Sequence, residues 1–441
     1  MIRRFFWGAL AALALPVLSL PAFAELPIQK ITSPGGITAW LVEDHEIPFT
    51  ALEIQIRGGT SLDPVDQRGV VNLMTGLIEE GAGDLDAQGF ANARDALAAH
   101  YSFNAGADGI SISAQFLTEN RDQAVDLLRL ALTEPRFDAD AVERVRGQVL
   151  SNIRSNLKNP EDIASTRFDS LAYGTHPYGS SGDGTETSVA GLSRADIVAA
   201  FKGSLSRDRL YVAATGDIDA DQLGALLDTL LGGLPAKGLP LPKRADWGLK
   251  GGVTVVDFPG PQSVIFFGHQ GIKRDDPDFF PAYILNEILG GGRFTARLMT
   301  EVRDKRGLTY GISSFLFPQD LGETMIGQFS SANATTAEAI AVVRSEWARM
   351  YRDGVTPEEL ATTKTYLTGS YPLRFDGNAR IARILVGMQT DGLPIDYAQT
   401  RNAKIEAVTV EDIAKIAKRL LKPEDLHFVV VGRPDGLETS P

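Results

Sequence analysis

The chain has 441 residues, of which 44% are hydrophobic and 22% are charged, and its formal net charge is −13. This length and composition indicate a globular protein with more than one hydrophobic core, so we expect at least two domains. The acidity gives no electrostatic reason to bind nucleic acid or anionic lipid, and the lack of cysteine excludes disulfides, thiolate nucleophiles and cysteine-based zinc sites.

Residues 1–24 have the pattern of a secretory signal peptide. Arginines at positions 3 and 4 form a basic start, an apolar stretch covers 5–20, and Ala-Phe-Ala at 22–24 suits cleavage. A retained membrane anchor is the alternative, but the apolar stretch is short for a bilayer span. We therefore expect cleavage, a net charge of −15 after the loss of two arginines, no later transmembrane segment, and a periplasmic or secreted protein.

Alternating apolar and polar residues predict strands at 37–44 and 49–59, and again at 253–258 and 263–270. Helical segments follow each pair of strands as a group instead of alternating strictly with single strands. This grouping favours an α+β fold, in which a mostly antiparallel sheet carries helices on one face.

Residues 69–83, GVVNLMTGLIEEGAG, predict a helix that runs into a glycine-rich stop. The polar or small residues along this helix are Asn72, Thr75 and Gly76, none of which is a usual metal ligand or general base. The two adjacent glutamates near its end would point in different directions, which favours a solvated helix end over a catalytic carboxylate pair. The chain's five histidines are also too far apart in sequence for one helix to present two of them to a metal ion.

An internal repeat links residues 192–216, LSRADIVAAFKGSLSRDRLYVAATG, with residues 408–432, VTVEDIAKIAKRLLKPEDLHFVVVG. Each stretch contains a Ser or Thr N-cap with an aspartate three positions later, then an amphipathic helix, a charged turn and a strand that ends in glycine. The mature chain therefore has the pattern of two copies of one α+β unit.

Residues 236–250 are rich in proline, glycine and charge, and we predict that they form a linker. They would join an N-terminal α+β domain, residues 25–235, to a C-terminal α+β domain, residues 251–441. We expect a clam-like arrangement of the two homologous halves.

The most distinctive segment of the second half is GGGRFTARLMTEVRDKRGLTYGISSFLF, residues 290–317. It predicts a helix, a stop at Gly307 and a strand, with Arg303 in the last helical turn and Tyr310 at the start of the strand. Taken without further information, these would be an arginine in a surface ion pair and a tyrosine in the core.

With these motifs the chain resembles the pitrilysin/insulinase family of zinc peptidases, specifically its shorter members similar to the mitochondrial processing peptidase. The resemblance covers essentially the whole mature chain and implies the duplicated α+β fold. In catalytic members a first-half helix carries H-x-x-E-H, whose histidines bind zinc and whose glutamate is the general base. The two histidine positions fall here on Asn72 and Gly76, and the glutamate position falls on Thr75.

The family's third zinc ligand is a glutamate further downstream, in a frame that FDADAVERVRGQVLSNI, residues 137–153, matches. The ligand position falls on Asn152, and a supporting glutamate seven residues earlier falls on Val145. Amides, a hydroxyl, a glycine and a valine do not supply the ligands that zinc requires. The resemblance therefore implies a degenerate zinc site, no cofactor on this chain, and a first-half helix kept for packing.

The second half, in contrast, keeps the family's signature, in which an arginine and a tyrosine reach into the zinc site. These positions are Arg303 and Tyr310. A guanidinium and a phenol can donate to a developing oxyanion or to a peptide carbonyl. In heterodimeric members one chain carries the zinc motif and the other carries this pair.

The resemblance thus implies a zinc-less subunit of an exported heterodimeric metallopeptidase, inactive on its own. Zinc would be held by a homologous H-x-x-E-H partner, and the substrate would be an extended peptide or unfolded polypeptide. Two alternatives stay open: a peptide-binding pseudoenzyme or chaperone-like module, and a structural subunit of a larger assembly. A purely structural subunit has no need for both Arg303 and Tyr310.

Overall fold

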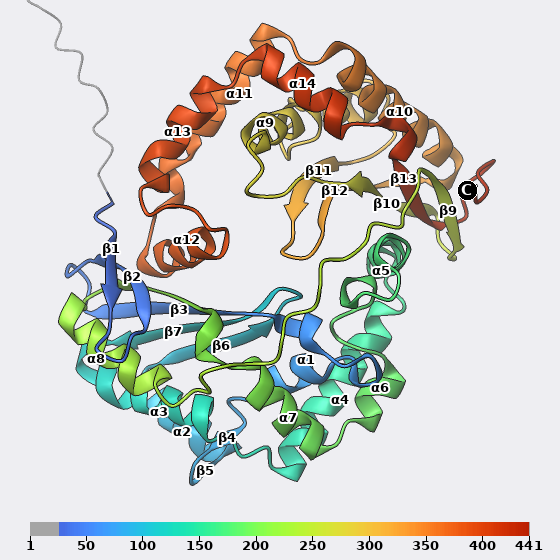
Figure 1. Cartoon of the computed structure of the whole chain (residues 1–441). Coiled ribbons are helices and arrows are strands. Elements are labelled where there is room, and N and C mark those ends of the chain that lie inside the picture. The colour runs from blue at the N-terminus through green and yellow to red at the C-terminus, as the bar shows by residue number, and fades with distance from the viewer. Residues whose placement is uncertain (1–25, 441) are drawn as a thin grey trace, which may run out of the picture.

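The computed structural model describes residues 26–440, which form two similar α+β halves (Figure 1). The signal peptide predicted at 1–24 lies outside the described residues. Within 26–440, the helices are all too short or too polar to cross a bilayer.

The first half contains a sheet of six strands, in which only β2 and β8 run parallel. Two of its strands agree closely with the predicted segments at 37–44 and 49–59. In spatial order the strands are β1 (Gln29–Thr32), β2 (Thr38–Glu43), β8 (Leu210–Gly216), β3 (Phe49–Arg57), β7 (Gly109–Leu117) and β6 (His100–Ala105). A short separate hairpin is formed by β4 (Gly81–Ala82) and β5 (Leu85–Asp86).

The helices of the first half follow the strands in groups, as the sequence predicts. They are α1 (Val70–Thr75), α2 (Ala87–Ala96), α3 (Arg121–Thr133), α4 (Ala139–Asn156), α5 (Pro160–Tyr173), α6 (Glu186–Gly191), α7 (Arg194–Ser204) and α8 (Ala220–Leu231). Most of them cover one face of the sheet and enclose a single large apolar core with it.

The second half repeats this arrangement. Its sheet has the order β9 (Gly252–Asp257), β13 (His427–Gly432), β10 (Gln262–Gln270), β12 (Glu323–Ala332) and β11 (Ile312–Pro318). Strand for strand, this matches β2-β8-β3-β7-β6, and the one parallel pair, β9 with β13, lies at the corresponding place. Its helices are α9 (Phe279–Leu289), α10 (Thr336–Asp353), α11 (Pro357–Ser370), α12 (Asn378–Thr390), α13 (Tyr397–Ala407) and α14 (Val410–Leu420). The predicted duplication of one α+β unit is therefore confirmed.

The sequence repeat corresponds to helix α7 with strand β8 and helix α14 with strand β13. Both helices begin with a complete capping box, in which side chain and backbone of the N-cap exchange hydrogen bonds with the third helical residue. The boxes pair Ser193 with Asp196 and Thr409 with Asp412. The N-cap pattern in the sequence thus identified both helix starts correctly.

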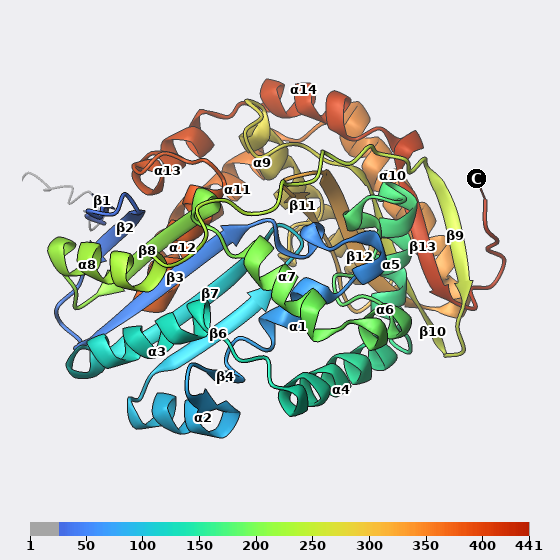
Figure 2. The ribbon, with the colours of Figure 1, turned by 60° about the horizontal axis from the view of Figure 1, so that its bottom comes forward.

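The two halves are joined by helices that cross from one to the other (Figures 1 and 2). Helix α12 of the second half packs on β8 and β3 of the first sheet, and α5 of the first half packs on β13 and β10 of the second sheet. On β2, Leu41 faces the core of its own half while Trp40 and Val42 face α12. Each sheet therefore has its own helices on one face and a helix of the other half on the opposite face.

The segment between α8 and β9, which includes residues 236–250, contains neither helix nor strand. It is nevertheless packed: the ring of Trp247 lies 6.3 Å from that of Phe168 and 5.7 Å from that of Tyr173, both on α5. In Figure 1 this segment runs between the two halves.

Candidate functional site

Helix α1, with Gly76 directly after it, carries the positions that correspond to the zinc motif, and it is shorter than predicted. It begins after Gly69, whose φ of +94° is left-handed, and ends at Thr75. The Asp63 carboxylate accepts hydrogen bonds from the backbone N–H groups of Gly69 (2.8 Å) and Val71 (2.9 Å), which fixes the start of the helix. The backbone then passes into turns, so the glutamates at 79 and 80 do not form a helix end as expected.

Those glutamates lie in turns and bind arginines from other elements. Glu79 accepts a hydrogen bond from Arg94 of α2 at 3.0 Å, and Glu80 accepts two from Arg144 of α4 at 2.9 and 2.6 Å. Their role is therefore to attach neighbouring helices.

The replaced positions on α1, directly after it and on α4 form no metal site. Thr75, at the general-base position, is 2% exposed and donates its hydroxyl proton to the carbonyl of Val71 at 2.8 Å. A Cβ atom on Gly76 would lie 3.3 Å from the side chain of Val145, so these two positions do face each other. Asn152 lies exposed on α4. Residues 26–440 contain no group of three or more His, Cys, Asp or Glu side chains arranged to hold a metal, and the donors present here do not fit zinc.

Asn72, at the first histidine position, is instead bound to a loop between η4 (Pro177–Gly179) and α6. Its amide donates to one oxygen of Asp183 at 3.1 Å, and Asn156 of α4 donates to the other at 3.3 Å. One carboxylate therefore ties α1 to α4. The pKa of Asp183 is raised by burial and by the charge of Asp162, while Arg68 opposes this shift.

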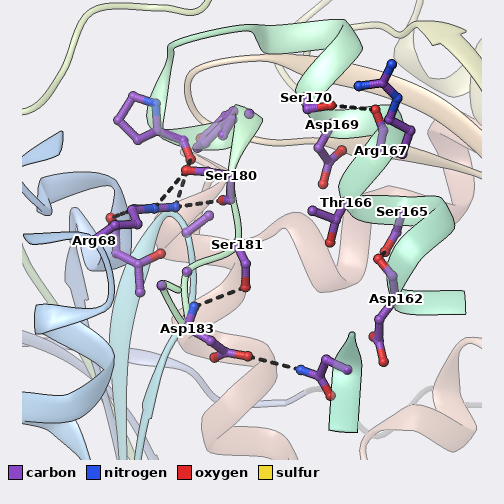
Figure 3. Close-up of a pocket in the computed structure, with 18 of the residues that line it drawn as sticks. Arg68, Asp162, Ser165, Thr166, Arg167, Asp169, Ser170, Ser180, Ser181 and Asp183 are labelled. Atoms are coloured by element: carbon purple, nitrogen blue, oxygen red, sulfur yellow. Dashed lines mark hydrogen bonds between the residues drawn. The ribbon is translucent and has the colours of Figure 1, made fainter. Parts of the chain in front are cut away.

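Arg68 attaches the same loop from the other side (Figure 3). Its guanidinium donates to the hydroxyl and carbonyl of Ser180 at 3.0 and 2.9 Å, to the carbonyl of Pro177 at 2.7 Å and to the carbonyl of Thr60. Asp63 lies 3.3 Å away as its counter-ion. Burial raises the pKa of Asp63 to about 6, against the opposing effects of its backbone hydrogen bonds and of Arg68.

Next to this loop is a cavity of about 1030 Å³ between the two halves. The first half lines it with α5 and with residues 177–187, which contain this loop, and the second half contributes Phe266, Phe317 and Ile326. Among the lining carboxyl groups, Asp169 of α5 is the most perturbed: burial raises its pKa to about 7. The cavity could not be predicted from the sequence, because it exists only where α5 crosses to the second sheet.

Arg303 and Tyr310 lie at the surface of the second half. Arg303 belongs to η6, a π-helical turn at Met299–Asp304, where we expected the last turn of an α-helix. Its side chain is 37% exposed, bonds Asp304 at 2.8 Å and lies 4.9 Å above the ring of Phe294. The surface ion pair considered for this arginine is therefore present.

Tyr310 is 91% exposed, so the interpretation as a core tyrosine is wrong. Strand β11 begins at Ile312, two residues later than expected, because Gly307 turns the chain with a φ of +64° and the backbone pairs only after Gly311. Tyr310 lines a second cavity of about 460 Å³ that also includes Glu161 of α5. Arg303 lines neither of the two cavities, so the fold of this chain does not bring the pair into one of them.

Comparison with known proteins identifies the relatives of this fold. Residues 39–186 match the family described as insulinase (peptidase family M16), and residues 191–367 match the peptidase M16 inactive domain. The non-peptidase homolog YmxG of Helicobacter pylori is 26% identical over 393 residues, which cover 88% of this chain and 90% of the relative. An uncharacterized zinc protease of Mycobacterium tuberculosis is 27% identical over 421 residues, which cover 91% and 92%.

A solved structure extends these matches to the fold as a whole. The crystal structure of a peptidase M16 inactive domain from Pseudomonas fluorescens has a TM-score of 0.87 and 27% identity, and covers 94% of this chain and 100% of that one. Together with the matched strand order of the two halves, these similarities show that the chain belongs to peptidase family M16, the insulinase family.

Proposed function

We propose that this chain is the zinc-less subunit of an exported heterodimeric metallopeptidase and that it supplies Arg303 and Tyr310 to a partner's zinc site. The observation that carries the proposal is the contrast between the two sites. The ligand positions Asn72, Gly76 and Asn152 cannot hold zinc, whereas Tyr310 is 91% exposed and accessible to another molecule.

The names of the two relatives differ on activity, since one is called a non-peptidase homolog and the other a zinc protease. The residues of this chain favour the first description for the chain on its own, because Thr75 has no proton-accepting carboxylate and is bonded within its helix. A peptidase activity therefore requires metal ligands from a second polypeptide, for which a homologue with H-x-x-E-H is the simplest source.

In such a pair, Arg303 and Tyr310 have a specific task. Peptide hydrolysis places negative charge on the scissile carbonyl oxygen, and a guanidinium and a phenol hydroxyl are suitable donors to it. Arg303 is held by Asp304 and Phe294 but remains partly exposed, so its guanidinium has donors left for a substrate.

An extended peptide or unfolded polypeptide is the proposed substrate. In the described part of the chain, β6 and β11 each pair with a strand on one side only, which leaves a free edge where a peptide backbone can add as a further strand. The cavities between the halves are lined in part by strands of these two sheets and by the loops next to them.

The test is purification of the chain alone and together with an H-x-x-E-H homologue from the same cell. We expect the chain alone to hold no stoichiometric zinc and to cleave no peptide, and the pair to cleave peptides in a chelator-sensitive reaction. A pair in which glutamine replaces the partner's motif glutamate is the control, and it should assemble without activity. Chelator-sensitive hydrolysis by this chain alone would contradict the proposal.

A peptide-binding module without catalytic partner is the second candidate, and one observation favours it. The cavity of about 1030 Å³ is formed by both halves of a single chain, so a peptide could bind there without another subunit. Recovery from the periplasm as a monomer or homodimer, with bound peptide and without a zinc-bearing homologue, would support this candidate over the first.

A further inference from the structure

A third cavity lies entirely within the second half, away from the positions that correspond to the family's catalytic residues. Its volume is about 240 Å³ and it lies between α9, β11, α13 and the short helical turn η8 (Pro372–Arg374). We call it the arginine pocket. Its lining residues are mainly arginines and aromatic residues: Arg274, Arg374, Arg401, Phe279, Phe280, Tyr283, Phe315, Tyr397, Leu316, Asn286 and Glu287.

Arg401 is the buried charge of this pocket. It is 5% exposed, and its Nη1 atom donates to the carbonyl of Leu367 at 3.2 Å and to the side chain of Asn402 at 3.1 Å. Its guanidinium also lies 4.2 Å above the ring of Tyr371. Within residues 26–440, the hydrogen bonds of its side chain go to this carbonyl and this amide and not to a carboxylate, and they leave the donors on Nε and Nη2 available.

A buried guanidinium without a directly bonded acidic partner is unusual, because transfer of a charge out of water is compensated in proteins by a counter-charge. Arg274, which also lines the pocket, has such a partner, Asp391, at 3.1 Å, and it also donates to the hydroxyl of Tyr397 at 3.0 Å. Arg274 is thus neutralised within the fold and serves to position the pocket wall.

Arg374 gives the pocket a second positive charge without a carboxylate partner in the described part of the chain. It is exposed at the end of η8, where a ligand could reach it. Glu287 is the one acidic residue that lines the pocket; its pKa is raised by burial, against the effects of Arg293, Arg374 and Arg401. Two arginines therefore face a single glutamate, and an excess of positive charge remains.

The other walls are aromatic. The rings of Phe279 and Tyr283 are stacked at 6.5 Å with an angle of 4°, and those of Phe280 and Tyr397 at 6.4 Å with an angle of 25°. Phe315 of β11 is 38% exposed. Flat apolar walls of this kind pack against a planar or apolar group, while the arginines provide paired donors that match a carboxylate.

We propose that the arginine pocket binds a carboxylate attached to an aromatic or apolar body, with Arg401 and Arg374 donating to the carboxylate oxygens. The volume is below the roughly 300–1,000 Å³ of pockets for drug-sized ligands, so the ligand is about the size of one amino acid. The carboxylate could belong to a free small acid or to the C-terminus of a polypeptide. This inference does not depend on a zinc-bearing partner.

The test uses N-acetylphenylalanine and its uncharged amide as probes, titrated into the full chain by calorimetry or by NMR. We expect the acid to bind about tenfold more tightly than the amide, because charge-assisted hydrogen bonds to arginine are lost in the amide. Arg374→Gln should weaken binding of the acid about tenfold, and because Arg374 is exposed, this variant should fold normally.

The matched control is Arg380→Gln, which removes the same charge from an exposed arginine of α12 that does not line the pocket. Equal affinities for acid and amide, or equal effects of the two variants, would overturn the inference. A peptide of about ten residues that ends in phenylalanine distinguishes the sources. Tighter binding of this peptide than of N-acetylphenylalanine supports a polypeptide C-terminus, and weaker binding supports a free acid.

Discussion

The two halves have the same strand order but use their polar residues in opposite ways. In the first half, Asn72 of α1 and Asn156 of α4 both donate to Asp183, and Arg68 donates to the backbone of the loop that carries Asp183. These polar groups thus connect α1, α4 and the loop, and Figure 3 shows Arg68 and Asp183 among them. In the second half, Tyr310 extends into solvent and Arg303 is partly exposed. The comparison shows that Asn72, at a replaced ligand position, is bonded within the fold, whereas Arg303 and Tyr310 are accessible at the surface.

Matched substitutions of one arginine in each half test this comparison directly. Arg68→Met removes a buried guanidinium, which leaves Asp63 without its counter-ion and several carbonyl groups without their donor, so we expect the free energy of unfolding to fall by about 3–5 kcal/mol. Arg303→Met should lower it by less than about 1 kcal/mol, because the ion pair with Asp304 is exposed. Urea denaturation of both variants is the measurement, and equal losses would show that the two sites do not differ in this way.

The next largest effect concerns turnover in a reconstituted pair with an H-x-x-E-H subunit. Arg303→Ala or Tyr310→Phe should each reduce kcat by about 10²–10³, the usual cost of one lost oxyanion donor, without changing assembly. Tyr366→Phe is the control, because it removes a hydroxyl from another exposed tyrosine of the same half. If turnover is unchanged in all three variants, Arg303 and Tyr310 have no role at a shared zinc site.

The sequence predicted the elements of each half better than the way in which the halves meet. Local alternation and capping residues identified the strands and the starts of α7 and α14, because these signals depend on neighbouring residues. Helices α5 and α12 each pack on the sheet of the other half, so both faces of each sheet are buried. The continuous apolar run of β13, HFVVVG, was the sequence signal that indicated this burial.

The candidate site was predictable only in part for a similar reason. The family resemblance predicts the replaced ligand positions at Asn72 and Gly76, and in the structure Gly76 faces Val145. The bond from Asn72 to Asp183 joins residues 111 positions apart, and no local pattern predicts such a contact. The exposure of Tyr310 likewise depends on the exact start of β11, which sequence patterns do not define to the residue.

The contact between the halves can be tested through the pH dependence of stability, to which Asp169 contributes. Its pKa is about 7 in the folded chain and 3.8 as an ordinary aspartate, because burial disfavours the charged form. The folded state thus binds this proton more tightly than the unfolded state, so the contribution of Asp169 to stability is greatest below about pH 4 and is lost as the pH rises through about 7.

Asp169→Asn should therefore change stability little near pH 4 and raise it near pH 8. One pKa unit corresponds to about 1.4 kcal/mol, and since the cavity admits water, we expect a gain of about 1–2 kcal/mol. Denaturation of the parent and the variant at both pH values is the measurement. Asp122→Asn, at a fully exposed side chain, is the control and should show no such pH-dependent gain. Equal pH dependence in parent and Asp169→Asn would contradict burial of a charged group at this contact.

The smallest expected effect concerns the elements in which the two halves are most alike. In α7 the hydroxyl of Ser193 accepts from the N–H of Asp196 at 3.2 Å, and in α14 that of Thr409 accepts from Asp412 at 3.1 Å. Ser193→Ala and Thr409→Ala should each lower the free energy of unfolding by about 1 kcal/mol, since each removes an N-cap acceptor. The double variant should lose the sum, because the two caps share no partner. Urea denaturation of the three variants checks this, and losses that differ by more than about 1 kcal/mol would show that the duplicated elements no longer contribute equally to the two halves.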